Sequence, residues 1–273
     1  MKLLKYLVIV CIFTGCKNVN TLERYDLYNE DIGSIINYVS YNYDTILKKW
    51  VSLPDSSASI ECEVVYPKIN DNYFIKSFLD SILRITLRAW LVDTIMPEWS
   101  ISDILNQTIN SFKELIKSED TNYLTIKDFT YSTSFNVIHP FDKIWILKKN
   151  HYSYTGGAHG YYYEEYYSFI ENNLIKDIRE LIKDTIKFKE LQIEYLKKQC
   201  KIPTNVDLSE AGFFVSDESF FLTNNFFFTP DTFYTCYNPY DIACFADGIQ
   251  RIAVPMSNVL PLLKDEKKQY FKK

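Results

Sequence analysis

Strand-type alternation fills the middle of the chain and limits the folds open to it. From Phe129 to Val137, mostly aromatic and apolar residues alternate with hydroxyl and amide side chains, which is typical of a strand with one exposed face. Two more strands are predicted directly afterwards, over residues 143–154 and 160–169. Because these strands follow one another without helices between them, the pattern favours an α+β fold with antiparallel sheet and helices packed on one side. It disfavours a doubly wound nucleotide-binding fold.

Two amphipathic helices are predicted before this strand-rich part. In the first, which Asp71 can cap, apolar residues recur at steps of three and four. These residues would form its buried stripe: Ile75, Phe78, Ile82, Ile85 and Ala89. The second helix would begin at Ser100, since Ser100 and Asp103 have the spacing of a capping box. Each helix has one polar face, so each should cover a core from one side only.

Shorter elements complete the expected organisation. Alternation over residues 59–66 predicts a strand that Pro67 ends. A tight turn is expected at Asn172-Asn173. The remaining predictions are a helix at 185–199, strands at 220–228, 233–237 and 248–254, and short helical turns at 239–246 and 257–263. We therefore expect two consecutive α/β subdomains, residues 46–139 and 140–265.

The first 15 residues have the pattern of a bacterial lipoprotein signal peptide. Lys2 and Lys5 precede an apolar run at residues 6–13, which is shorter than the roughly 20 residues of a membrane span. Small residues directly before Cys16 are typical of a lipobox, in which the cysteine becomes N-terminal and carries fatty acids such as palmitate. We expect lipidation at Cys16, a tether and N-terminal segment over residues 16–45, and a place in the bacterial cell envelope outside the cytoplasm. The alternative is an ordinary secretory signal with an incidental cysteine.

The charge of the chain argues against nucleic acid as a partner. Its formal net charge is −5, and removal of a leader that contains two lysines would make it −7. No dense cluster of lysine and arginine is present, and an acidic protein repels phosphate.

Besides Cys16, four cysteines lie outside the leader: Cys62, Cys200, Cys236 and Cys244. An exported protein can form disulfides, and four cysteines allow three pairings. We rank Cys236 with Cys244 first, because these two residues flank a predicted turn.

Three of the seven glycines lie in the stretch Tyr154–Gly160, beside His159. A structural interpretation gives Gly156 and Gly157 a positive φ or a close backbone approach, explains the small Ala158 in the same way, and has His159 bond the loop backbone. A catalytic interpretation needs a group that orients His159 and a nucleophile within reach. The spacing selects no such pair. We therefore expect an architectural loop, with a hydrolase that uses His159 as the alternative.

The sequence predicts neither a metal site nor a cofactor. The three histidines, His139, His151 and His159, are twelve and eight residues apart across predicted strands and loops, which is a poor ligand set. Glycine-rich loops that bind nucleotide phosphates are also absent from the sequence.

Tyrosines are concentrated directly after the glycine-rich loop. Strand alternation places Tyr162 and Tyr166 on one face, and Tyr161, Tyr163 and Tyr167 on the other. One of these faces can belong to a core, whereas the other would expose aromatic side chains, as a recognition surface does.

Two motifs in the second half resemble a known family. They are YSYTGGAHG at Tyr152–Gly160 and FYTCYNPYDIACFADGIQRIAVPMSNVLPLL at Phe233–Leu263. Both resemble the extracellular domain of the lysozyme-sensing anti-sigma factor of Gram-positive bacteria. That domain also occurs in the non-catalytic part of a peptidoglycan deacetylase and in a secreted mycobacterial antigen. Upstream, VVYPKIN at Val64–Asn70 is similar to its usual companion domain, whereas residues 171–174 depart from the hairpin turn that is common in the family.

The resemblance implies a mixed α/β fold and a binding role without catalytic residues. In the anti-sigma factor this domain binds lysozyme, so lysozyme-like protein or peptidoglycan is the expected partner. The candidate binding surface combines the outer tyrosine face with the Asn-Pro-Tyr turn, at Tyr162, Tyr166, Tyr237, Asn238 and Tyr240. We expect a non-enzymatic, lipid-anchored binding or sensing protein, and the alternative remains a cell-envelope hydrolase with His159 in its active site.

Overall fold

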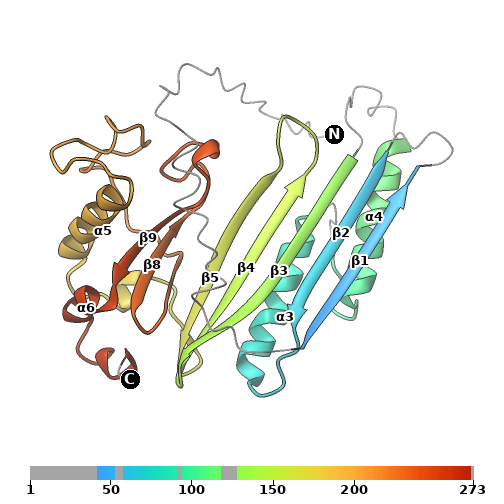
Figure 1. Ribbon diagram of the computed structural model, residues 1–273. Coiled ribbons are helices and arrows are strands. Elements are labelled where there is room, and N and C mark those ends of the chain that lie inside the picture. The colour runs from blue at the N-terminus through green and yellow to red at the C-terminus, as the bar shows by residue number, and fades with distance from the viewer. Residues whose placement is uncertain (1–41, 53–57, 91–93, 118–127, 272–273) are drawn as a thin grey trace.

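The computed structural model describes residues 42–52, 58–90, 94–117 and 128–271, which form two sheets flanked by helices (Figure 1). The predicted leader, Cys16 and the tether up to residue 41 lie outside the described residues. The α+β class is confirmed. Within the described residues, no helix has the length and apolar character needed to cross a bilayer.

The larger sheet has six strands in the order β1-β2-β3-β4-β5-β6. Their bounds are Tyr43–Val51, Ser59–Pro67, Asp128–Phe141, Ile144–Tyr154, Tyr161–Ile170 and Asn173–Leu174. All neighbouring pairs are antiparallel except β2 and β3, which are parallel. This pair differs from the antiparallel expectation because the chain leaves β2 and passes through two helices before it returns as β3. Parallel strands require such a long crossover. The boundary expected between residues 139 and 140 lies inside β3.

Helices α3 (Tyr73–Arg88) and α4 (Ile101–Lys117) form the crossover, and their buried residues share one core with those of β2 and β3. The predicted capping box of α4 is present, because Ser100 N–H donates to Asp103 Oδ2 at 2.9 Å and Asp103 N–H donates to Ser100 Oγ at 3.2 Å. Asn72, not Asp71, caps α3 by accepting from the N–H of Ile75.

The buried stripe of α3 differs from the prediction. Ile85 is 65% exposed, whereas the helix buries Ile75, Leu79, Leu83, Thr86 and Leu87. Two apolar stripes overlap on this helix, and the more leucine-rich one faces the sheet. Ile82 and Phe78 lie beside it as partly buried residues.

The second sheet has three antiparallel strands, β7 (Phe226–Phe228), β8 (Thr232–Tyr237) and β9 (Gln250–Pro255). Helix α5 (Thr185–Gln199) packs on β9, and the short α6 (Met256–Val259) contacts β8 and β9. Their apolar side chains form a second core together with Ile144 and Ile146 of β4 and with Tyr166 and Ile170 of β5. The two sheets are therefore joined through the β4–β5 hairpin.

The β5–β6 turn uses Glu171 and Asn172, with φ of 48° and 65°. Positive φ at both central residues is the geometry of a two-residue hairpin. Asparagine adopts this conformation more readily than most residues. The segment that departs from the family pattern thus still closes a tight hairpin, with Ile170 paired to Asn173.

Candidate binding site at the tip of the β4–β5 hairpin

The glycine-rich loop joins β4 to β5 at one end of the larger sheet (Figure 1). Gly156 and Gly157 have φ of 100° and 102°, a region that glycine enters without steric cost. Gly160 has a different constraint, because a β-carbon there would lie 2.5 Å from the ring of Tyr152. Tyr154 adds a link across the loop by donating its hydroxyl proton to Gly157 O at 3.2 Å.

His159 is held by the loop backbone and by an aromatic ring. Its Nδ1 lies 2.9 Å from Gly160 O, so this nitrogen carries the proton and donates to the carbonyl. The imidazole stacks on Phe245 at 3.7 Å between ring centroids and 18° between planes. Within the described part of the chain, no carboxylate or hydroxyl forms a hydrogen bond with His159. The orienting partner and nucleophile that a catalytic histidine needs are therefore not assembled around it in this structure.

Phe245 is the point at which the two sequence motifs meet. It opens the short helical turn η3 (Phe245–Asp247). Besides His159, its ring contacts Tyr162 of β5 at 5.3 Å and Tyr240 of the Asn-Pro-Tyr turn at 5.8 Å. His159 and Tyr240 are exposed, and Tyr162 and Phe245 are half-buried. We call this set, His159, Tyr162, Tyr240 and Phe245, the aromatic platform.

The Asn-Pro-Tyr turn is tied to β5 by Asn238. Its Oδ1 accepts from Glu164 N–H at 2.8 Å, and its Nδ2 donates to Glu164 O at 3.1 Å. Asn225, just before β7, bonds the same strand edge, accepting from Tyr166 N–H at 2.9 Å and donating to Glu164 O at 2.8 Å. Two side-chain amides thus take the place of a neighbouring strand along this part of β5. Asn238 therefore positions the platform.

A buried charge cluster lies where the two sheets join. Glu164 of β5 pairs with Lys148 of β4 at 2.9 Å and with Arg251 of β9 at 2.7 Å, and Tyr166 donates its hydroxyl proton to Glu164 at 2.9 Å. Burial by itself raises the pKa of Glu164, but Arg251 and Lys148 outweigh it and hold that pKa below its ordinary value. Because each charge is buried and paired, the cluster joins three strands from both sheets.

Two residues of the expected binding surface are not accessible. Tyr166 is 5% exposed and stacks on Phe227, and Tyr237 is fully buried and donates its hydroxyl proton to Phe221 O. Both belong to the core between the sheets, so neither can contact a partner in this conformation. Of the five residues proposed from the sequence, Tyr162 and Tyr240 lie on the platform.

Other aromatic residues extend the exposed area or belong elsewhere. Tyr152 and Tyr161 are exposed at 40% and 45%. Tyr167 is half-buried and packs on Phe78 of α3. His159 and Phe245 are the platform residues that the sequence did not select as a surface. A signal for Phe245 was available, since it lies in the second motif only five residues after Tyr240.

The expected Cys236–Cys244 disulfide is not formed, because both residues carry free thiols in the structure. Cys236 lies in β8 with its side chain in the core, whereas Cys244 precedes η3 and donates its thiol proton to Asp247 at 3.0 Å. Burial raises the pKa of both thiols, to about 12 for Cys236 and about 11 for Cys244. The strand and the turn thus direct the two side chains to different surroundings.

The histidines do not come together as a ligand set. His139 stacks on Trp145, while His151 lies between Trp90 and Tyr163. Among the residues that the structure describes, no group of three or more histidine, cysteine, aspartate or glutamate side chains could hold a metal ion.

Two family profiles match consecutive parts of the chain. Residues 54–162 match the family described as "Deacetylase PdaC", and residues 164–257 match "Protein of unknown function (DUF3298)". The first match contains the companion-domain motif at Val64–Asn70 and the glycine-rich loop, and the second contains most of the later motif. The two matches meet at Tyr163, inside β5. No curated protein matches the sequence.

Solved structures have the same fold at low sequence identity. A member of the DUF3298 family from Bacteroides fragilis NCTC 9343 has a TM-score of 0.63 and 16% identity, over 85% of this chain and 98% of that chain. A DUF3298 family protein from Pseudomonas aeruginosa PAO1 has a TM-score of 0.60 and 13% identity, over 83% of this chain and 96% of that chain. The chain is thus similar to the DUF3298 family of unknown function over residues 164–257 and to the family described as "Deacetylase PdaC" over residues 54–162, and it has the fold of solved DUF3298 proteins.

Proposed function

We propose that this protein is a lipid-anchored binding protein of the bacterial cell envelope and that the aromatic platform is its contact surface. The observation that carries the proposal is the convergence of two motifs, about 80 residues apart in sequence, on Phe245. The rings of His159 and Tyr240 remain exposed there. Aromatic side chains on a rigid base are the residue type enriched at binding hot spots.

The charge around the platform favours a basic partner. Asp241, next to Tyr240, is exposed, and the chain carries a net charge of −5. Complementary fields speed the association of oppositely charged proteins. A lysozyme-like protein fits this requirement, and peptidoglycan is the second ligand to try because the family resemblance points to the cell wall. Anchoring through Cys16 would keep the platform on the outer side of a membrane.

The alternative function is hydrolysis of an envelope substrate with His159 as the base. The exposure of the His159 side chain is the feature that favours this alternative. Against it, the ring is stacked on Phe245 and its Nδ1–H donates to the backbone carbonyl of Gly160, so no carboxylate orients it.

Calorimetric titration of the full-length chain in detergent tests the proposal. Lysozyme and soluble peptidoglycan fragments serve as separate ligands, and release of product from the fragments is followed in parallel. Saturable heat with either ligand and no product supports the binding function. Absence of heat with both ligands, together with hydrolysis that His159→Ala abolishes, would replace binding by the hydrolase.

A further inference from the structure

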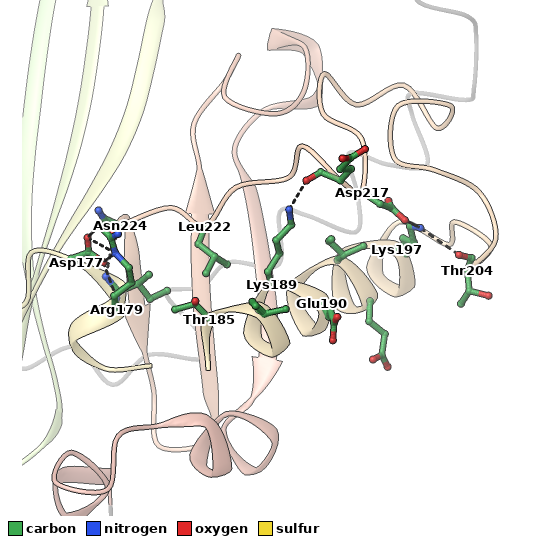
Figure 2. Close-up of a pocket in the computed structure, with 15 residues that line it drawn as sticks. Asp177, Arg179, Thr185, Lys189, Glu190, Lys197, Thr204, Asp217, Leu222 and Asn224 are labelled. Atoms are coloured by element: carbon green, nitrogen blue, oxygen red, sulfur yellow. Dashed lines mark hydrogen bonds and ion pairs between the residues drawn. The ribbon is translucent and has the colours of Figure 1, made fainter. Parts of the chain in front are cut away.

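A second feature of the molecule lies away from the platform, along helix α5. A cleft of about 910 Å³ separates one side of α5 from the segment at residues 217–224 (Figure 2). None of the platform residues lines it. Its volume is in the range of sites that take a ligand of drug size or a short peptide.

The cations of this cleft are already engaged with its walls. Arg179 pairs with Asp177, Lys197 pairs with Asp217, and Lys189 donates to Glu218 O at 2.6 Å. Figure 2 shows Lys189 and Lys197 reaching from α5 to the opposite wall. The contacts of Lys189 and Lys197 thus join α5 to the opposite wall.

Three carboxylates of the cleft lack a cation. Within the described residues, Glu190, Glu194 and Glu218 form no ion pair, although all three line the cleft and are exposed. The site therefore presents net negative charge to any ligand that enters it. Glu190 and Glu194 are one helical turn apart, about 6 Å along the axis. Alternate side chains of an extended peptide are about 7 Å apart, so two basic residues of such a peptide can face both carboxylates.

Apolar and main-chain groups complete the complementarity. Ile186 is 74% exposed at one end of the cleft, and Ile193 and Leu222 are half-buried along it. Leu222 lies in an irregular segment, and its N–H and C=O have no hydrogen-bond partner among the described residues. A free donor and acceptor beside a groove are what an extended peptide uses when it pairs with an exposed edge.

We propose that the cleft binds an extended cationic peptide segment. On the side of the peptide that faces α5, two basic side chains contact Glu190 and Glu194, and an apolar side chain two residues before them contacts Ile186. The main chain of the peptide pairs with Leu222. The part of α5 that lines the cleft, from Thr185 to Lys197, is about 18 Å long. This length accommodates about five residues of an extended chain. The inference does not depend on the function proposed for the platform.

Fluorescence anisotropy with the full-length chain tests this site. The probe is a labelled pentapeptide of sequence Leu-Ser-Lys-Ser-Lys, and the acidic counterpart Leu-Ser-Glu-Ser-Glu is its control. We expect saturable binding of the basic peptide only. The double variant Glu190→Gln/Glu194→Gln should bind it about 5-fold more weakly, as expected for the loss of two exposed ion pairs.

A charge-matched double variant, Glu210→Gln/Glu266→Gln, controls for the overall field, since both residues are exposed and neither lines the cleft. It should bind the peptide like the wild type, as should Tyr240→Ala on the platform. Equal weakening by both double variants, or binding of the acidic peptide with the same affinity, would overturn the assignment. So would saturable binding of a glucosamine tetramer without binding of the peptide, which would make the site one for a cationic sugar.

Discussion

A β-carbon added at Gly160 would meet atoms of the Tyr152 ring at 2.5 to 2.6 Å, closer than real contacts allow. These atoms are at the far end of a side chain that is 40% exposed, so the Tyr152 ring can turn aside. Gly160→Ala should therefore destabilise the protein by about 0.5–1.5 kcal/mol, the cost of forcing a side chain off its preferred rotamer. Urea unfolding measures this free energy. The effect should shrink in a Tyr152→Ala background, where the obstructing ring is gone. An equal loss of stability in both backgrounds would show that the Tyr152 ring is not the cause.

The pH dependence of folding should report on His151. Burial lowers the pKa of His151 from 6.5 to about 4, with a further decrease from Lys149 and an opposing increase from Glu165. Because the folded pKa is the lower one, this contribution to stability is complete above pH 6.5 and is lost as the pH falls toward 4. After allowance for partial exposure, the loss is about 2 kcal/mol.

Substitution of this histidine checks the assignment. His151→Phe keeps a flat ring between Trp90 and Tyr163 but cannot be protonated. Its free energy of unfolding should decrease less than that of the wild type between pH 6.5 and pH 4. If the two proteins lose stability in parallel over this interval, other groups dominate the acid sensitivity.

At the residue scale, the sequence predicted the environment of the loop better than that of the tyrosines. Gly156 and Gly157 have the positive φ that was considered for them. Strand alternation correctly separates Tyr166 from Tyr167, but it cannot say which face a second sheet covers. Tyr166 is buried because β7 packs over it through Phe227. The Glu164–Arg251 pair joins residues 87 positions apart, a contact that one sequence does not reveal.

Among the secondary-structure elements, the edge of β5 depends on two amides rather than on a strand. Asn225→Ala would leave Tyr166 N–H without its partner and would remove one of the two amides that donate to Glu164 O. It should cost about 1–3 kcal/mol in the free energy of unfolding, measured in urea. Asn205→Ala, at an exposed loop residue, should change stability by less than about 0.5 kcal/mol. Similar small effects at both positions would mean that water replaces the amide of Asn225.

The elements themselves were largely predictable, whereas their faces and pairing were less so. The capping box at Ser100 and the alternation in β2 are local signals, and both are present in the structure. The prediction placed the wrong face of α3 in the core. Two apolar stripes overlap on this helix, and only its contact with the sheet determines which of them is buried. The parallel pairing of β2 with β3 depends on the path of α3 and α4, which hydrophobic periodicity does not describe.

For the whole molecule, membrane attachment depends on Cys16. We expect Cys16→Ala to remain unprocessed or to leave the detergent fraction, because the fatty acids would have no thiol to carry them. The loss of lipid is measured by electrophoretic mobility and by partitioning of the protein into the detergent phase. A Cys62→Ala variant is the control, since that residue lies in the core. Unchanged mobility and membrane retention of Cys16→Ala would contradict lipidation.

The assembly of the platform is a property of the complete fold. Its residues come from the β4–β5 loop, from β5 and from the segment before β9. Asn238, Asn225 and the Glu164 cluster bring these segments together. Both motifs, and Tyr162 and Tyr240 as surface residues, were predicted from the sequence. The contact of Phe245 with both tyrosines could not be predicted, because it depends on the complete fold.

The central claim is that the platform is the contact surface, and matched calorimetric titrations of Tyr240→Ala and Tyr73→Ala test it most directly. Tyr73 is 84% exposed at the start of α3 and makes no contact with the platform rings. With the ligand that binds the wild type, Tyr240→Ala should lose at least about 10-fold in affinity, because truncation of a hot-spot aromatic costs 1–2 kcal/mol or more. Tyr73→Ala should bind like the wild type. Equal affinity of the two variants, with both proteins folded, would contradict the account.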